Sequence, residues 1–328
     1  MNLLPKASGS RPRLACEIAP EGVTAARAAA TAEAALDSVA RIPLADGAVM
    51  PGLKPGNLTD RVAVIAAIRR ALEAIDVRPN SRGAELTIII PDAAVRVLLL
   101  DFDALPAKLT EALPIVRFRL KKLVPFEIDD AMVSYQVMSS SKTTVRVLAV
   151  AIPRDILAEY ETAVREAGFE PGAVLPSTLA ALAGVAAPEA SLVVNAGSAG
   201  VTTAITRDGV LLLHRSVDLQ PAASGVDPEI PAQLQQLSVA EITHEIAQAV
   251  TVAVAYFEDT LSATPSTILS AGSLSADALR HVLSGNGYNE ADAVRVRELI
   301  DASAFSAGAV TGSIPRGSLA GVAGALRG

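Results

Sequence analysis

The chain has 328 residues, of which 51% are hydrophobic, and its formal net charge is −7. This length and apolar content predict a folded protein with a large core, whereas no apolar run reaches the roughly 20 residues that a membrane-spanning helix needs. A single cysteine and three scattered histidines exclude an intrachain disulfide and a zinc cluster, so no metal site is expected. The acidic balance argues against nucleic acid as the main partner.

The first half of the chain is predicted to alternate between strands and helices after a flexible tail at residues 1–13. The tail has no apolar core of the kind found in a signal peptide, so we expect a cytoplasmic protein. An amphipathic helix is predicted between Asn57 and Ile75, with Asn57 or Thr59 as its N-cap. The other predicted elements are strands at 14–19, 23–29, 38–44, 85–91, 95–102, 131–138 and 144–152, and helices at 105–123, 154–167 and 177–185.

The pattern of strands restarts at residue 192, which predicts a second lobe. A loop is predicted at 220–237, followed by the longest helix at 239–261, with Ser238 as N-cap and Glu241 completing a capping box. The remaining predicted elements are strands at 192–195, 201–206, 210–217 and 266–271, and helices at 275–283 and 319–326.

Residues 192–209, LVVNAGSAGVTTAITRDG, form the most informative segment. An apolar strand leads through a Gly/Ser/Thr turn into a second strand, and such a turn can direct several backbone N–H groups at one anion. The turn contains Gly197, and the second strand contains Thr202 and Thr203. Asn195, however, stands where an acidic residue would help to manage a metal-bound phosphate. The segment therefore predicts the architecture of a nucleotide site with altered chemistry.

Three short segments follow one another in the first half of the chain: VRF at 116–118, LVPF at 123–126 and SYQV at 134–137. Together with the two strand meanders and their glycine turns, they resemble the PilM family of cytoplasmic type IV pilus assembly proteins. The resemblance implies an α/β, two-lobed actin-like (ribonuclease H-like) ATPase fold with a PilM/FtsA-type inserted subdomain. It implies lobe I at 14–186, with the inserted subdomain at about 93–172, lobe II at 187–316, and a C-terminal helix at 317–328 that returns toward lobe I.

The resemblance also implies a nucleotide site, and three of its segments depart from the family pattern. In the first loop, 17–22, Pro20 removes a backbone donor and Glu21 adds a negative charge where a triphosphate would already be repelled. The second loop has Asn195, and the third reads SAGS at 270–273. We therefore expect no catalytic residue and no bound cofactor, with ATP and Mg²⁺ as the alternative. The predicted vestigial site comprises Glu17, Gly22, Asn195, Gly197, Thr202, Thr203, Gly272 and Ser273.

The function implied by the resemblance is that of a scaffold at the cytoplasmic face of the inner membrane. Its expected partners are the N-terminal tail of a PilN-like membrane protein and components of the pilus motor or platform, and self-association is a further expectation. The chain's own Asn2, Leu3, Leu4 and Pro5 resemble the start of PilN, so this tail is a candidate occupant of a peptide groove. Two alternatives stay open: an active, nucleotide-gated ATPase of the same machine, and a GspL-like platform protein of type II secretion.

Overall fold

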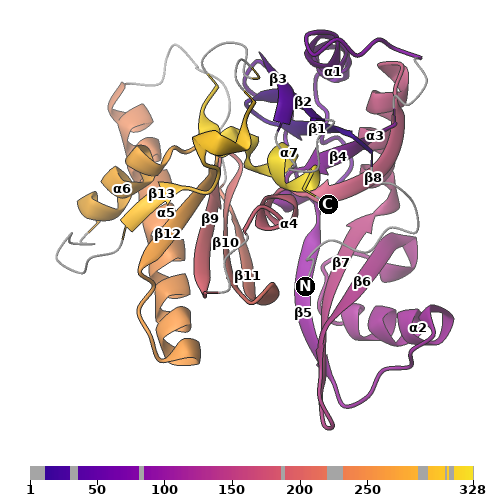
Figure 1. The fold of residues 1–328 in the computed structure, drawn as a ribbon, viewed down its shortest axis with the longest axis vertical. Helices are drawn as coiled ribbons and strands as arrows, with labels where there is room; N and C mark the ends of the chain where they lie inside the picture. The colour runs from indigo at the N-terminus through magenta and orange to yellow at the C-terminus, as the bar shows by residue number, and fades with distance from the viewer. Residues whose placement is uncertain are drawn as a thin grey trace.

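A computed structural model describes residues 12–29, 36–80, 85–185, 189–219, 232–286, 295–306, 309 and 314–327. The predicted tail motif, residues 2–5, lies outside this range. The described residues form two five-stranded sheets and one three-stranded sheet (Figure 1). Of the described helices, including the 30-residue α5 (Ala232–Leu261), none combines the length and the hydropathy that a bilayer crossing requires.

The two five-stranded sheets share one topology, in which an antiparallel meander of three strands is extended by two parallel strands. We call the first sheet with α1 (Arg61–Glu73), α3 (Arg154–Glu166) and α4 (Ser177–Leu182) the first lobe. The second sheet with α5 and α6 (Ala276–Gly285) is the second lobe. The first sheet runs in the order β3 (Leu36–Pro43), β2 (Gly22–Ala28), β1 (Leu14–Ala19), β4 (Glu85–Ile90), β8 (Glu170–Pro176). The second runs β11 (Val210–Asp218), β10 (Gly200–Arg207), β9 (Ser191–Ala196), β12 (Thr267–Gly272), β13 (Arg295–Glu298).

Helices cover both faces of each sheet, because alternate residues of the central strands point to opposite sides. In β1, Cys16 and Ile18 pack against α1 (Arg61–Glu73) and α3 (Arg154–Glu166), whereas Ala15 faces α4 (Ser177–Leu182) and α7 (Ala320–Ala325). The outer face of the second sheet packs against α5 and α6 (Ala276–Gly285). Residues of both sheets join α4 and α7 in one central apolar cluster, so these two helices lie between the lobes (Figure 1).

The third sheet is inserted between β4 and α3. It runs β5 (Arg96–Phe102), β7 (Val145–Pro153), β6 (Ala131–Ser140), and α2 (Leu109–Leu120) covers one of its faces (Figure 1). We call these strands and α2 the inserted subdomain. A short 3-10 turn, Asp92–Ala94, connects β4 to it and brings Asp92 to the end of the first sheet.

The N-cap of α1 is Asp60, whose carboxylate accepts a hydrogen bond of 3.0 Å from the N–H of Ala63. The prediction of Asn57 or Thr59 as the cap was wrong. Asn57 is instead fully buried in the preceding loop, where its side-chain amide accepts from the Gly52 N–H at 2.9 Å and donates to the Gly52 carbonyl at 3.1 Å. A buried amide needs such partners more than a helix end exposed to water needs a cap.

Replacing Asp60 by alanine is expected to lower the free energy of unfolding by about 1 kcal/mol, because one N–H at the start of α1 loses its acceptor. Urea denaturation measures the change. The control is Asp46→Ala, which removes an exposed carboxylate from a loop and should leave the unfolding midpoint unchanged. Equal midpoints for the two variants would contradict the role of Asp60 as the cap.

The second half of the chain corrects two further predictions. The long helix α5 begins at Ala232 rather than at residue 239, so Ser238 is not an N-cap and the capping box with Glu241 does not exist. The predicted loop at 220–237 is therefore helical over its last six residues, while 220–231 lie outside the described residues. Residues 232–237 contain neither glycine nor proline, so nothing in them interrupts a helix that the later residues have begun.

Candidate functional site

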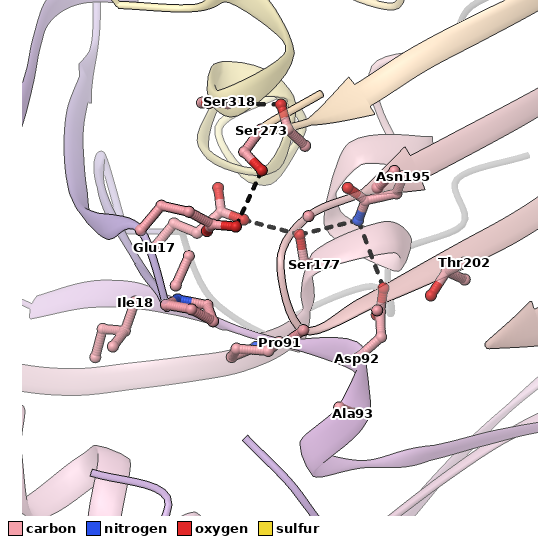
Figure 2. A pocket seen from close by; sticks show the side chains of 18 of the residues that line it. Glu17, Ile18, Pro91, Asp92, Ala93, Ser177, Asn195, Thr202, Ser273 and Ser318 are labelled. Carbon is pink, nitrogen blue, oxygen red and sulfur yellow. Dashed lines mark hydrogen bonds between the residues drawn. The ribbon is translucent and has the colours of Figure 1, made fainter. Parts of the chain in front are cut away.

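A small cavity lies between the lobes, where the β1–β2 turn of the first lobe faces the β9–β10 hairpin of the second (Figure 2). Its volume is about 80 Å³. The structure brings together seven of the eight residues predicted for the nucleotide site. The seven that line the cavity are Glu17, Gly22, Asn195, Gly197, Thr202, Gly272 and Ser273.

Thr203 is the predicted residue that does not line the cavity. It follows Thr202 on β10, and successive side chains of a strand point to opposite faces. Thr202 faces the cavity and its hydroxyl lies 3.0 Å from that of Ser216 on β11. Thr203 is fully buried on the other face, and its hydroxyl oxygen has no hydrogen-bond partner within the described ranges. The pair of threonines therefore contributes one residue to the site.

Asn195 at the end of β9 connects the two lobes through its side-chain amide. The Nδ2 group donates to the hydroxyl of Thr178 at 2.9 Å and to that of Ser177 at 3.1 Å, both at the start of α4, and it lies 3.5 Å from Asp92 Oδ2. Asp92 is itself buried and accepts from the Thr178 N–H at 3.1 Å and from the Thr178 hydroxyl. A carboxylate at position 195 could donate no hydrogen bond and would face the charge of Asp92, which gives a physical reason for asparagine here.

Glu17 belongs to the same group of polar side chains, and Figure 2 shows Ser177 between Glu17 and Asn195. Its Oε1 accepts from the Ser177 hydroxyl at 2.8 Å, while its Oε2 is buried and has no hydrogen-bond partner in the described part of the chain. Burial raises the pKa of Glu17 to about 7, against the opposing effect of the Ser177 hydrogen bond. Oε2 is directed at α7, where a Cβ atom on Gly321 would lie only 2.5 Å away. Glycine at 321 therefore permits the helix to pack on this carboxylate.

Glu21, in the β1–β2 turn, has a different environment. Its Oε1 accepts a hydrogen bond of 2.7 Å from the backbone N–H of Ser198 in the β9–β10 hairpin, and one of 3.0 Å from the Ser273 hydroxyl after β12. Burial by itself would raise the pKa of Glu21, but the hydrogen bonds from Ser198 and Ser273 hold it below its ordinary value. Glu21 is thus an ionised carboxylate that spans from the first lobe to the second.

Neither a protein-family model nor a curated protein matches the sequence. Among solved structures, the chain is similar to that of the PilM-PilN type IV pilus biogenesis complex, with 17% identity, a TM-score of 0.72, and coverage of 96% of this chain and 97% of that chain. The chain has a PilM-like, actin-like ATPase fold.

Two other solved structures are similar to this chain at lower TM-scores. The ethanolamine utilization protein EutJ from Carboxydothermus hydrogenoformans gives a TM-score of 0.50 at 10% identity, covering 100% of this chain and 92% of that chain. The cytoplasmic domain of EpsL, an inner membrane component of the type II secretion system of Vibrio cholerae, gives 0.40 at 14% identity, covering 66% of this chain and 78% of that chain.

An actin-like ATPase fold implies Mg·ATP as the ligand to consider for the cavity, but the residues present do not fit it. The cavity of about 80 Å³ is far smaller than the roughly 300–1,000 Å³ of typical ligand pockets. Its lining carries the carboxyl groups of Glu17, Glu21 and Asp92 against one guanidinium, that of Arg41. Within the described ranges, no group of three or more His, Cys, Asp or Glu side chains could hold a metal ion. The Ser198 N–H, a donor that a phosphate could use, is already bonded to Glu21.

Sequence reasoning missed Asp92 and Ser177 as central residues of the site. Asp92 follows the buried strand β4 after a single proline, and Ser177 follows β8 directly. Because β4 and β8 are parallel neighbours, their carboxyl ends meet at one edge of the sheet. A polar residue after each of two adjacent parallel strands was the available signal, but β8 itself was not predicted, so the neighbourhood could not be recognised.

Proposed function

We propose that this chain is a scaffold component of a type IV pilus or related secretion assembly, where it binds the N-terminal tail of a PilN-like membrane protein. The observation that carries the proposal is the structural likeness to PilM over nearly the whole length of both chains. The solved relative belongs to a complex with PilN. A position at the cytoplasmic face of the inner membrane, contacts with motor or platform components, and self-association belong to the same proposal.

The proposed scaffold does not hydrolyse ATP. This part of the proposal is supported by the small cavity, by the hydrogen bond that Glu21 makes to the Ser198 N–H, and by Asn195 in place of a carboxylate. Pro20 supports it as well, because a proline in the β1–β2 turn has no N–H to offer a phosphate.

The inserted subdomain offers the surface for the proposed peptide. Exposed apolar side chains that gather in one region commonly mark a site of protein interaction. Of the ten exposed large hydrophobic residues among those described, six lie in or beside this subdomain: Leu109, Ile115 and Phe118 on α2, Leu123 in the turn after it, and Met132 and Val137 on β6. Phe118 is the most exposed of the six, at 69%, and the ammonium group of Lys122 lies 5.7 Å from its ring centre. We assign the leucines of the PilN-like tail to this part of α2.

Isothermal titration calorimetry tests the proposal with a synthetic peptide that begins MNLLPKASG, the chain's own first nine residues, which serves as the NLLP-type probe. The protein used lacks residues 1–6, so that its own tail does not compete. We expect a dissociation constant on the order of 10 µM, as for a short extended peptide that docks with two leucine side chains. A peptide with aspartate at both leucine positions should not bind.

Two variants locate the binding surface. Phe118→Ser is expected to weaken the peptide roughly tenfold, whereas Val62→Ser, on α1 and 78% exposed, should leave the affinity unchanged. Both positions are exposed on helices, so neither change disturbs the core. Absence of binding by the truncated protein would contradict the proposed function, and equal affinity in the two variants would place the peptide elsewhere than on α2.

A further inference from the structure

A side chain of the protein itself occupies the backbone N–H at the tip of the β9–β10 hairpin, because Glu21 accepts from Ser198 there. We propose that Glu21 is a built-in anion that takes the place of a nucleotide phosphate and clamps the two lobes together without a ligand. The proposal rests on the geometry of the cavity and does not depend on the proposed function.

The donors that Glu21 uses are those that an anionic ligand would use. Its Oε1 accepts from the Ser198 N–H at 2.7 Å and from the Ser273 hydroxyl at 3.0 Å. Ser198 lies at the tip of the glycine-containing hairpin, and a Cβ atom on Gly197 would stand 3.1 Å from the same oxygen. A backbone N–H in a turn and a hydroxyl group thus converge on one anionic oxygen. Backbone turns bind phosphate groups by the same arrangement of donors.

The two contacts of Glu21 cross from one lobe to the other. Glu21 lies in the β1–β2 turn, whereas its partners are 177 and 252 residues further along the chain, in two separate segments of the second lobe. Hydrogen bonds to a carboxylate are about twice as strong as neutral ones. The neighbouring interlobe contacts, which Asn195 makes with Ser177 and Thr178, are neutral. Asn195 also approaches the Asp92 carboxylate, but only to 3.5 Å, so the 2.7 Å bond of Glu21 to Ser198 is the shorter contact with a carboxylate here.

Glu21 and a phosphate group cannot occupy the site together. Both need the Ser198 N–H, and their negative charges would lie at contact distance. A phosphate or diphosphate group can enter only when the carboxylate leaves. Removing the carboxylate should consequently have two effects: it loosens the lobes, and it opens an anion site that the natural chain lacks.

Hydrogen exchange at single-residue resolution tests the clamp in the full chain. In Glu21→Ala the Ser198 N–H loses its acceptor, so its exchange should accelerate at least roughly tenfold. The adjacent N–H of Gly197, which donates to the Gly200 carbonyl at 3.0 Å, is the internal reference and should change much less. The matched control is Glu73→Ala, which removes an exposed carboxylate from the last turn of α1 and should alter neither N–H.

Inorganic pyrophosphate tests the anion site by chemical rescue. Loss of the charged hydrogen bonds should lower the melting temperature of Glu21→Ala by about 3–6 °C. Pyrophosphate at about 5 mM should restore about 2 °C of this loss, relative to sodium chloride at the same ionic strength, and should leave the natural chain and Glu73→Ala unchanged. Glu21→Gln, which keeps the side chain in place without its charge, should be destabilised but not rescued.

Three results would overturn the proposal. The first is unchanged Ser198 exchange in Glu21→Ala, and the second is pyrophosphate stabilisation of the natural chain equal to that of the variant. The third is a melting temperature for both Glu21 variants equal to that of Glu73→Ala. If Glu21→Ala does not fold, exchange of the Ser198 N–H in Glu21→Gln decides, because a neutral amide oxygen should protect this N–H less than the carboxylate does.

Discussion

Replacing Gly324 by alanine is expected to lower the free energy of unfolding by at least about 3 kcal/mol. An added Cβ atom would stand 1.9 Å from the carbonyl oxygen of Ala180 and 2.9 Å from its carbonyl carbon. Both atoms belong to the backbone of α4, so no side-chain rotation relieves the overlap, and α7 has to move away as a whole. All six residues of α7 are buried between the lobes, so this movement disturbs the central apolar cluster.

The effect is measured by urea denaturation with Gly285→Ala as the matched control. Gly285 is the last residue of α6 and is exposed, and a methyl group added to it would meet no atom within 4 Å. Alanine there should be neutral or stabilising by about 0.5–1 kcal/mol, because glycine loses more conformational freedom on folding. If Gly324→Ala unfolds within about 1 kcal/mol of the natural chain, well below the expected loss, the close approach of α7 to α4 is not present in solution.

The strands that frame the site could be predicted from the sequence, because each has a local pattern. Buried runs such as those of β1, β4 and β9, ended by turns with glycine or proline, are visible without knowledge of their neighbours. The prediction of an α/β actin-like fold rested on these patterns and on the resemblance, and the structure and its likeness to a solved structure confirm it. β8 was missed because Pro171 and Gly172 near its start are uncommon inside a strand, and it pairs at the edge of its sheet, where proline is tolerated.

The chemistry of the site could be predicted only in part, because its contacts join residues that are far apart in the chain. Glu21 was interpreted as a charge that repels a triphosphate, and its hydrogen bond to Ser198, 177 residues away, has no counterpart in any local pattern. Asp92 was missed for the same reason, since its partner Thr178 is 86 residues away. The identity of Asn195 showed that the site had changed, but its role as a donor to α4 depends on the packing of the two lobes.

Glu17 is expected to make the protein less stable as the pH rises from about 4.5 to about 7. Burial raises its pKa in the folded protein to about 7, compared with an ordinary value of 4.5. Below 4.5 the group is neutral in both states and its contribution is fully present. Between the two values, ionisation favours the unfolded chain, and above about 7 the contribution is lost. A shift of this size corresponds to about 3 kcal/mol.

Glu17→Gln should therefore stabilise the protein by up to about 3 kcal/mol at about pH 8 while changing little at about pH 4.5. In the natural chain the Ser177 hydroxyl lies 2.8 Å from Glu17 Oε1, and the amide oxygen of glutamine can accept from it in the same way. The other end of the side chain, which faces Gly321 and has no partner among the described residues, then carries no charge. Urea denaturation across this pH range measures the change, and Glu73→Gln on α1 controls for the loss of one carboxylate.

The direction of this effect separates a structural cavity from a site that uses the charge of Glu17. A carboxylate that binds a cation or a metal-bound water has to be ionised, and the protein then stabilises the charged form. In the structure the three carboxyl groups that line the cavity face a single guanidinium, and Glu17 Oε2 has no donor among the described residues. A Glu17→Gln variant that is less stable than the natural chain at about pH 8 would therefore mean that the ionised carboxylate has a cationic partner in solution, and the cavity would then use the charge of Glu17.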